Sequence, residues 1–509
     1  MALFDADALP RARRLSQLVY CNPFLSERIE HERSVLGADF DEATADWNLH
    51  ADWPTPLPNI ERLAAISVAL ADAARERLTR GHRPDADDCK LYEDVVLLAL
   101  YYERRPQLDR VAAALENDPG HDLADCWDEF AFRAHHYLDV ATPRPDGREL
   151  ARLFAFFLQI SRAFHRVFDC IIGTSGPAVR LRAQVWQSIF THDLERYRRT
   201  LYERMGDHAT LITGPSGTGK ELVARAVGQS RFVPFDPRTR RLTPDPCPGF
   251  HALNLSALGA QLVEAELFGH KRGAFTGAVS DREGWLETCP PHGCVFLDEI
   301  GEIEPAIQVK LLRVLEERTF HRVGETRDRR FAGKLVAATN RDLAHEMAAG
   351  RFRTDLYYRL CSDTIRTPSL HERFADDGRE RRVLLEYLAG RLVGDDAADL
   401  ADEVEAWIDG ALGTEYRWPG NVRELEQCVR NVMIRGEYHP AEAASGTPPR
   451  DDAWAELAAA MHGGGLPADE LLRRYVELVH RETGSLSAAA QRLRLDRRTV
   501  RARLGTDPN

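Results

Sequence analysis

The heptapeptide GPSGTGK, residues 214–220, has the residue types and spacing that bind phosphate groups. Its glycines let the backbone turn tightly, so that successive N–H groups point at phosphate oxygens, and Lys220 adds a positive charge. A strand-like TLIT precedes it and a helix-like ELVARAVG follows it, which is the context of a P-loop rather than of an ordinary glycine-rich turn. The predicted ATP-binding residues in this stretch are Gly214, Pro215, Ser216, Gly217, Thr218, Gly219, Lys220 and Glu221.

Two adjacent carboxylates follow the apolar segment Val295–Leu297, which we expect to be a buried strand. Asp298 and Glu299 then lie at the carboxyl end of that strand, where ligands bind in open parallel sheets. We expect Asp298 to hold Mg²⁺ and Glu299 to polarise an attacking water. Because Glu221 stands where a P-loop usually has Ser or Thr, part of the Mg²⁺ coordination should pass through water. The alternative is a solvated acidic turn.

Three regions with different patterns must position these residues. Residues 1 to about 180 repeat apolar side chains at helical spacing, as in LARLFAFFLQISRAFHRVF. From about 181 to 440, short apolar strands alternate with helices, which predicts a parallel sheet covered by helices on both faces. A polar segment rich in Pro and Gly then precedes a final helical region.

The hexapeptide GAFTGA, residues 273–278, predicts a loop that is flexible at both ends and exposes one aromatic ring to a partner. A buried hairpin with a core phenylalanine is the alternative. Together with GPSGTGKE, this sequence resembles the sigma-54-interacting AAA+ activators, also called bacterial enhancer-binding proteins, over roughly 205–435. Members of that family commonly carry Glu after the lysine. The resemblance implies that sigma-54 is contacted by Gly273, Ala274, Phe275, Thr276, Gly277 and Ala278.

The same resemblance assigns roles to three further polar residues. Asn254 would hold Glu299 in an inactive orientation until the nucleotide signals, although an asparagine in a core turn is the alternative. Asn340, in AATNRDL, matches the first sensor of the terminal phosphate. Arg423, in WPGNVREL, matches the second sensor, and we expect Asn421 to cap the helix that presents it.

Two arginines in GRFRTDLYYRL match those that reach into a neighbouring subunit's ATP site in the family. They are Arg353 and Arg359, and a guanidinium there would neutralise charge on the transferring phosphoryl group. The resemblance therefore implies an active ring, a hexamer. Surface salt bridges are the alternative for either arginine.

The sequence departs from the family pattern at two places. A Pro-rich insertion is expected at 235–250, and DTIRTPSLHER keeps only part of the family's proline-rich sequence. The expected domains are a helical regulatory domain of unknown signal (1–180), the α/β ATPase subdomain (181–365), an α-helical lid (366–440), a linker (441–466) and a DNA-binding domain (467–509).

The last segment resembles the helix-turn-helix of the factor for inversion stimulation. We expect Ala488, Ala489, Leu493 and Val500 to pack its helices, with Arg494 in the tight turn. The residues expected to face DNA are Arg497, Arg498, Thr499 and Arg501. A solvated basic helical hairpin is the alternative.

The formal net charge of −13 disfavours a protein that coats nucleic acid over its whole surface. No apolar run approaches the roughly 20 residues of a membrane span, and the first residues do not resemble a secretory signal, so we expect a cytoplasmic protein without a membrane partner. Together with the motifs, the resemblance implies an ATPase that binds ATP and Mg²⁺, enhancer DNA and the sigma-54 RNA polymerase holoenzyme. The alternatives are a DNA-bound regulator whose assembly ATP only stabilises, and an AAA+ remodeller of another machine.

Overall fold

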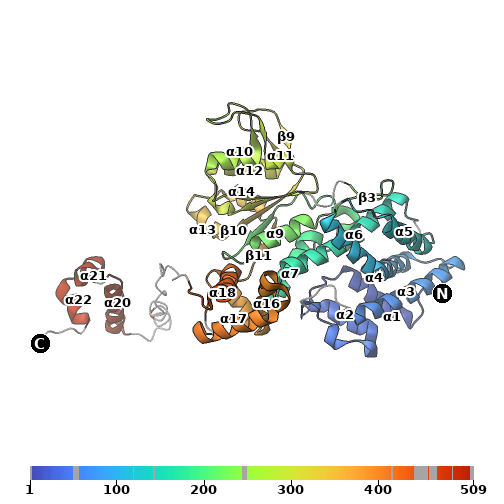
Figure 1. The fold of residues 1–509 in the computed structure, drawn as a ribbon, viewed down its shortest axis with the longest axis horizontal. Helices are drawn as coiled ribbons and strands as arrows, with labels where there is room; N and C mark the ends of the chain where they lie inside the picture. Colours follow the sequence, from blue (N-terminus) through green and yellow to red (C-terminus); the bar gives the residue numbers. More distant parts are fainter. Residues whose placement is uncertain are drawn as a thin grey trace. The chain divides into compact units, whose positions relative to one another are not determined.

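The computed structural model describes residues 3–49, 57–118, 120–140, 144–243, 249–413, 416–440, 457, 467–483 and 485–504. The chain divides into two compact units, Met1–Glu437 and Tyr438–Asn509. The first unit begins with helices that pack against one another (Figure 1). The main ones are α1 (Ala8–Tyr20), α2 (Ser26–Leu36), α3 (Pro58–Thr79), α4 (Ala86–Asn117), α5 (Ala124–Leu138), α6 (Gly147–Cys170) and α7 (Gly176–Phe190). Among the described residues, no helix combines the length and the hydrophobicity that crossing a bilayer requires.

A five-stranded parallel sheet follows, in the order β11-β1-β10-β7-β4. Its strands are β1 (Thr210–Thr213), β4 (Phe250–Asn254), β7 (Cys294–Asp298), β10 (Lys334–Thr339) and β11 (Asp363–Arg366). Thr213 pairs with Thr339, and Asn254 pairs with Asp298. The strands therefore end together at one edge of the sheet. The predicted parallel α/β arrangement is confirmed.

The two faces of the sheet pack against different helices because side chains alternate along each strand. Phe296 and Val336 belong to the core shared with α9 (Lys220–Gln229). Their neighbours Val295 and Leu335 belong to the core on the opposite face. That face is covered by α10 (Ala260–Phe268), α12 (Pro305–Glu317) and α14 (Thr354–Leu360). Both faces are thus buried, as a parallel sheet requires.

The N-terminal helices and the α9 face of the sheet share one hydrophobic core. Phe156 of α6 and Trp186 of α7 belong to the same buried cluster as Ile212 of β1 and Val223 of α9. Residue 180, the boundary expected from the sequence, lies inside α7, and the first strand begins only at Thr210. The apolar face of α7 packs against both α6 and α9. Helix α7 therefore already contacts the ATPase subdomain, although the alternation of strands and helices in the sequence begins only after it.

The expected insertion contains a short hairpin that docks on the N-terminal helices. Its strands are β2 (Phe235–Asp236) and β3 (Arg241–Leu242). The Phe235 ring lies 4.9 Å from that of Trp127 and 4.7 Å from that of Phe154, between centroids. Arg240 adds an ion pair with Asp128 at 3.0 Å. Residues 244–248 of the insertion lie outside the described residues.

The lid is helical, as expected. It consists of α15 (Leu370–Asp376), α16 (Arg379–Val393), α17 (Ala397–Ala411) and α18 (Asn421–Arg435). Ser369 and Glu372 form a reciprocal cap that fixes the start of α15. The lid is tied to the segment between α6 and α7, because the buried Glu380 carboxylate accepts hydrogen bonds from the N–H groups of Thr174 and Ser175.

The second unit contains α20 (Ala468–Thr483), α21 (Leu486–Leu493) and α22 (Arg497–Arg503). Its core includes Ala489 and Val500, as predicted, with Leu493 partly buried. Ala488 is exposed, so that part of the prediction is wrong; Ala490, two residues further along the helix, lies in the core instead. Arg494 ends α21 with φ +53°, which confirms its expected place in the tight turn. Apart from residue 457, the expected linker 441–466 lies outside the described residues.

Candidate active site

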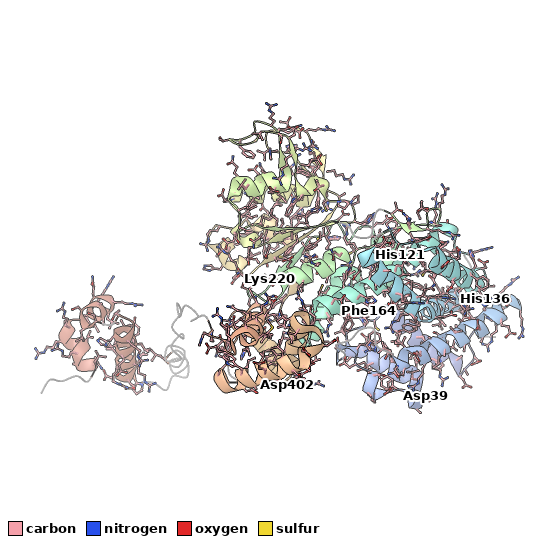
Figure 2. The ribbon with its side chains drawn as sticks, viewed as in Figure 1. Asp39, His121, His136, Phe164, Lys220 and Asp402 are labelled. Carbon is pink, nitrogen blue, oxygen red and sulfur yellow. The ribbon has the colours of Figure 1, made fainter. Side chains whose placement is uncertain are left out.

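The P-loop connects β1 to α9 and adopts a conformation that depends on glycine. Gly217 has φ +78°, and a Cβ atom there would lie 2.1 Å from the Gly420 carbonyl of the lid. The Lys220 ammonium donates hydrogen bonds to the carbonyls of Gly214 and Pro215, at 3.1 and 3.2 Å. Figure 2 labels Lys220 at the start of α9, where the sheet faces the lid helices. The loop and the lid therefore pack backbone against backbone.

The electrostatics of the site reflect its partial burial. Burial lowers the pKa of Lys220, although the charges of Glu299 and Asp298 oppose the shift. Burial raises the pKa of Asp298, and the Lys220 charge opposes that shift in turn. The ammonium of Lys220 and the carboxylate of Asp298 thus each favour the charged form of the other. A partly desolvated cation beside two carboxylates is suited to bind a phosphate chain together with a divalent cation.

Glu299 is held in an unusual backbone conformation at the end of β7. Its φ of +56° lies in the left-handed region, which non-glycine residues rarely adopt and which often marks functional positions. Its Oε2 accepts a hydrogen bond from the N–H of Asn340 at 3.2 Å. Two of the predicted site residues, from the ends of β7 and β10, are therefore joined directly.

Asn254 lies at the same edge but does not pair with Glu299, contrary to expectation. Its Oδ1 accepts hydrogen bonds from the N–H and the hydroxyl of Ser256, at 3.0 and 2.8 Å. The local turn after β4 satisfies this amide oxygen, because an Asn side chain readily bonds the backbone two residues later. Glu299 and Asn254 nevertheless both line the same cavity.

Asn421 links the lid to the P-loop instead of capping α18. Its Nδ2 donates to the Ser216 carbonyl at 2.9 Å, and its Oδ1 accepts from the Leu370 N–H at 2.8 Å. The residue is buried and has φ +53°. Two residues later, Arg423 reaches the Ser216 hydroxyl at 3.5 Å. The lid thus brings the expected second sensor to the loop.

Replacing Asn421 with alanine should lower the free energy of unfolding of this unit by about 2 kcal/mol, because the buried Leu370 N–H and the part-buried Ser216 carbonyl both lose their partner. Alanine at this position must still adopt the left-handed backbone conformation, which is unfavourable for any residue with a Cβ atom. Asn421→Gly loses the same hydrogen bonds but relieves that cost, so it should be more stable than the alanine variant by about 1 kcal/mol. Urea unfolding of the three proteins measures both differences. An alanine variant as stable as the parent would show that the bridge contributes nothing.

These residues line a cavity of about 480 Å³, within the range typical of small-molecule sites. The P-loop lies on one side, Asp298 and Glu299 lie on another, and Arg423 comes from the lid. The residues fit a nucleotide because the loop offers N–H groups and an ammonium to phosphates. They also fit Mg²⁺, which proteins commonly bind with one or two carboxylates plus substrate phosphates. Asp298 would be that carboxylate.

The sequence did not reveal part of the cavity wall. Ile171 and Ile172 reach it from the segment after α6, and Tyr387, Leu388 and Arg391 reach it from α16 of the lid. These apolar and aromatic side chains offer a surface for the base of a nucleotide. Their residue types occur in any helical core, so no motif distinguishes them, and only the tertiary packing of the lid and of the segment after α6 brings them to the P-loop.

The GAFTGA loop lies at the tip of a hairpin formed by β5 (Gly269–His270) and β6 (Arg282–Glu283). Thr276 is exposed, as expected for a contact residue. Phe275 is only half-buried rather than fully exposed, because its ring packs edge-on against His270 at 4.9 Å between centroids. The Gly273 N–H donates to the Ala278 carbonyl at 2.8 Å and closes the loop.

Comparisons with known proteins agree with this arrangement. The sequence profile of the family described as "Sigma-54 interaction domain" matches residues 191–366, which hold the sheet, the P-loop and the GAFTGA loop. The response regulator protein PilR of Pseudomonas aeruginosa is 34% identical over 348 residues, which cover 66% of this chain and 68% of PilR. The chain belongs to the sigma-54-dependent activator family.

Two further curated relatives match over shorter shares of their length. The transcriptional regulatory protein ZraR of Klebsiella oxytoca is 40% identical over 58% of this chain and 63% of its own length. The Nif-specific regulatory protein of Azotobacter vinelandii is 46% identical over 45% of this chain and 40% of its own. Among solved structures, NtrX from Brucella abortus aligns over 88% of this chain and 96% of its own, at 20% identity and a TM-score of 0.38. The chain thus spans 40 to 63% of the length of these two curated activators.

The two candidate finger arginines lie away from the P-loop cavity. Arg353 precedes α14 and pairs with Asp355 at 2.6 Å, whereas Arg359 lies within α14 and pairs with Glu316 at 3.1 Å. About half of each side chain is exposed. Neither is among the residues that line the cavity in the described part of the chain. Both arginines therefore form half-exposed ion pairs outside the cavity of their own chain.

The second unit exposes most of its candidate DNA contacts among the residues that the structure describes. Arg497, Arg498 and Arg501 are exposed on α22. Thr499 differs, because its hydroxyl donates to Asp496 at 2.8 Å and its N–H bonds the same carboxylate. Thr499 thus completes the cap of α22, and its hydroxyl is already engaged.

Proposed function

We propose that this chain is a ring-forming ATPase that binds enhancer DNA and remodels the sigma-54 RNA polymerase closed complex into an open complex. One observation carries the proposal: the GAFTGA hairpin projects from the subdomain whose sheet edge holds Lys220, Asp298 and Glu299. The two sites are connected through a single helix, since β4 ends at Asn254 and α10 then leads directly into β5. A change at the sheet edge therefore has a short path to the hairpin.

In the proposed reaction, the P-loop N–H groups and Lys220 bind the phosphates, exchanging the lysine's present carbonyl partners for phosphate oxygens. Asp298 holds Mg²⁺, which supplies charge neutralisation when bound. Glu299 orients the attacking water, and the Asn340 N–H fixes the direction of its carboxylate. Arg359 and Arg353 of an adjacent copy complete the site in a hexameric ring. Arg423 and Asn421, which link the lid to the P-loop, make the position of the lid depend on whether the P-loop holds a nucleotide.

The remaining regions have supporting roles in the proposal. Residues 1–180 regulate the ATPase in response to a signal. The arginines of α22 bind enhancer DNA, some through phosphates and some through base edges. The resulting activator would work in the cytoplasm. The basic surface of α22 supports the DNA assignment despite the acidic chain as a whole, because binding depends on local charge.

Replacing Thr276 with alanine should reduce open-complex formation at a sigma-54 promoter at least about tenfold while leaving ATP turnover within about twofold of the parent. Thr276 is exposed on the loop, remote from the P-loop cavity, so its loss removes a partner contact and not a catalytic group. Permanganate footprinting measures the open complex, and phosphate release measures turnover.

The matched control is Ser280→Ala, which removes an exposed hydroxyl two residues beyond the motif and should preserve both activities. If Thr276→Ala opens the promoter as well as the parent does, the loop does not grip sigma-54. If the parent turns over ATP but never binds sigma-54, the chain remodels another machine.

A further inference from the structure

A second cavity lies inside the N-terminal helices, separate from the P-loop cavity. Its volume is about 90 Å³, and its wall is built mainly from aromatic and aliphatic side chains of α1, α4, α6 and α7. They include Tyr20, Tyr101, Phe156, Phe164 and Trp186. Figure 2 labels Phe164 within this helical region. Well-packed interiors rarely leave space of this size among large side chains, so the void calls for an explanation.

The wall carries no uncompensated charge among the described residues. Its guanidiniums each have a carboxylate partner: Arg28 with Glu32 at 2.7 Å, Arg105 with Asp109 at 3.3 Å and Arg198 with Glu93 at 2.6 Å. An anionic ligand would lose its hydration without gaining a free cation, so phosphates and carboxylates do not fit. The occupant that fits is uncharged and mostly apolar.

The volume limits the size of that occupant. An apolar engineered cavity of about 150 Å³ binds benzene, so about 90 Å³ suits a compact molecule of roughly one small ring. Water is a poor occupant, because it needs two to four polar partners and most of the wall is apolar. The cavity therefore matches a small uncharged organic molecule.

Helix α6 connects this cavity with the ATPase site. One face of α6 gives Phe156, Phe157, Ile160 and Phe164 to the cavity wall. The opposite face holds the end of α9, the helix that begins at Lys220. There Gln159 donates to the Ser230 carbonyl at 2.9 Å, Arg162 donates to the Gln229 carbonyl at 2.9 Å, and Arg166 bonds the Gln229 side chain. A displacement of α6 by an occupant is thus transmitted to the P-loop helix.

We propose that the N-terminal helices bind a compact, uncharged, apolar effector in this cavity and that its binding changes the ATPase rate through α6 and α9. The binding step is independent of the proposed function. Only the rate change rests on it, and that step requires ATP turnover but not sigma-54.

The test uses the full chain with pyrrole and benzene as probes and pyrrole-2-carboxylate as the charged counterpart. Pyrrole should bind saturably in calorimetry and change the ATP turnover rate about fivefold, whereas the carboxylate should do neither. Leu98→Phe, which fills the cavity from α4, should weaken pyrrole binding at least about tenfold. Leu98→Ala, which enlarges it, should strengthen benzene binding about tenfold. Simple destabilisation would move both variants in the same direction.

Two further variants separate binding from transmission. Leu100→Ala alters the same helix outside the wall and should leave probe affinity unchanged. Arg166→Met removes one of the three contacts with the end of α9 and should retain pyrrole binding while its rate response falls by at least about half. Failure of both probes to bind the parent, or binding that Leu98→Phe leaves intact, overturns the proposal. Failure to open a sigma-54 promoter while pyrrole still binds and alters ATP turnover contradicts only the proposed function.

Discussion

Replacing Glu299 with glutamine should reduce ATP turnover about a thousandfold, while ATP affinity stays within about threefold of the parent. Glutamine has the same shape and can keep the hydrogen bond from the Asn340 N–H, but it cannot accept a proton or hold water with a negative charge. The phosphate-binding groups, Lys220 and the loop N–H donors, remain in place. Steady-state phosphate release and equilibrium binding of ATP measure the two quantities separately.

The control is Glu302→Gln, three residues along the same segment. Glu302 pairs with Arg341 at 2.5 Å and does not line the cavity in the described part of the chain. This variant removes one carboxylate from the neighbourhood, yet turnover should stay within about twofold, since a surface ion pair contributes about 1 kcal/mol or less. A Glu299→Gln protein that turns over ATP within about threefold of the parent would show that another group orients the water.

Much of the active site was predictable because its residues sit in short local patterns. The P-loop, Asp298, Glu299 and Asn340 each follow a strand-like segment, and parallel strands end at one edge, so the sequence order already implies that they meet. The turn at Arg494 was predictable because the resemblance to a helix-turn-helix places the tight turn there. A local pattern specifies a local conformation and the edge to which it belongs.

Contacts between distant segments were not predictable in this way. Nothing near Asn421 indicates that it bridges Ser216 and Leu370, which are far away in sequence. Asn254 had two competing partners, and the sequence could not show that the nearby Ser256 would satisfy its amide oxygen. The half-burial of Phe275 depends on His270, a residue with no special signal. Such outcomes are decided by tertiary packing.

The shared core also changes how the regulatory domain must be studied. A truncation after residue 180 would cut α7 and expose apolar residues that pack against the N-terminal helices, including Val223 and Val227 of α9 and Phe235 of β2. Exposing such a surface favours aggregation, so loss of activity in that truncation would not reveal whether the domain represses or activates. Point variants along α6 avoid this problem because they keep the core closed.

Replacing Arg359 with alanine should lower ATP turnover by about a thousandfold or more in the pure variant, because an arginine that reaches a neighbouring site neutralises charge on the transferring phosphoryl group. Arg359 is half-exposed, lies outside its own cavity and makes a surface ion pair with Glu316, so the change should leave folding and ATP binding intact. Arg351→Ala is the matched control, since Arg351 is an exposed arginine close by that pairs with Glu346. Its turnover should remain within about twofold.

Mixing the Arg359→Ala and Glu299→Gln proteins gives the decisive form of this prediction, since each variant supplies what the other lacks. In rings assembled at random from equal amounts of the two variants, about one quarter of the interfaces join an intact Glu299 to an intact Arg359 from the adjacent copy. The mixture should therefore recover about a quarter of the parental turnover if the sites act independently. An arginine that acts within its own chain gives no recovery at any mixing ratio. Recovery that grows with total protein concentration would further show that assembly creates the complete site.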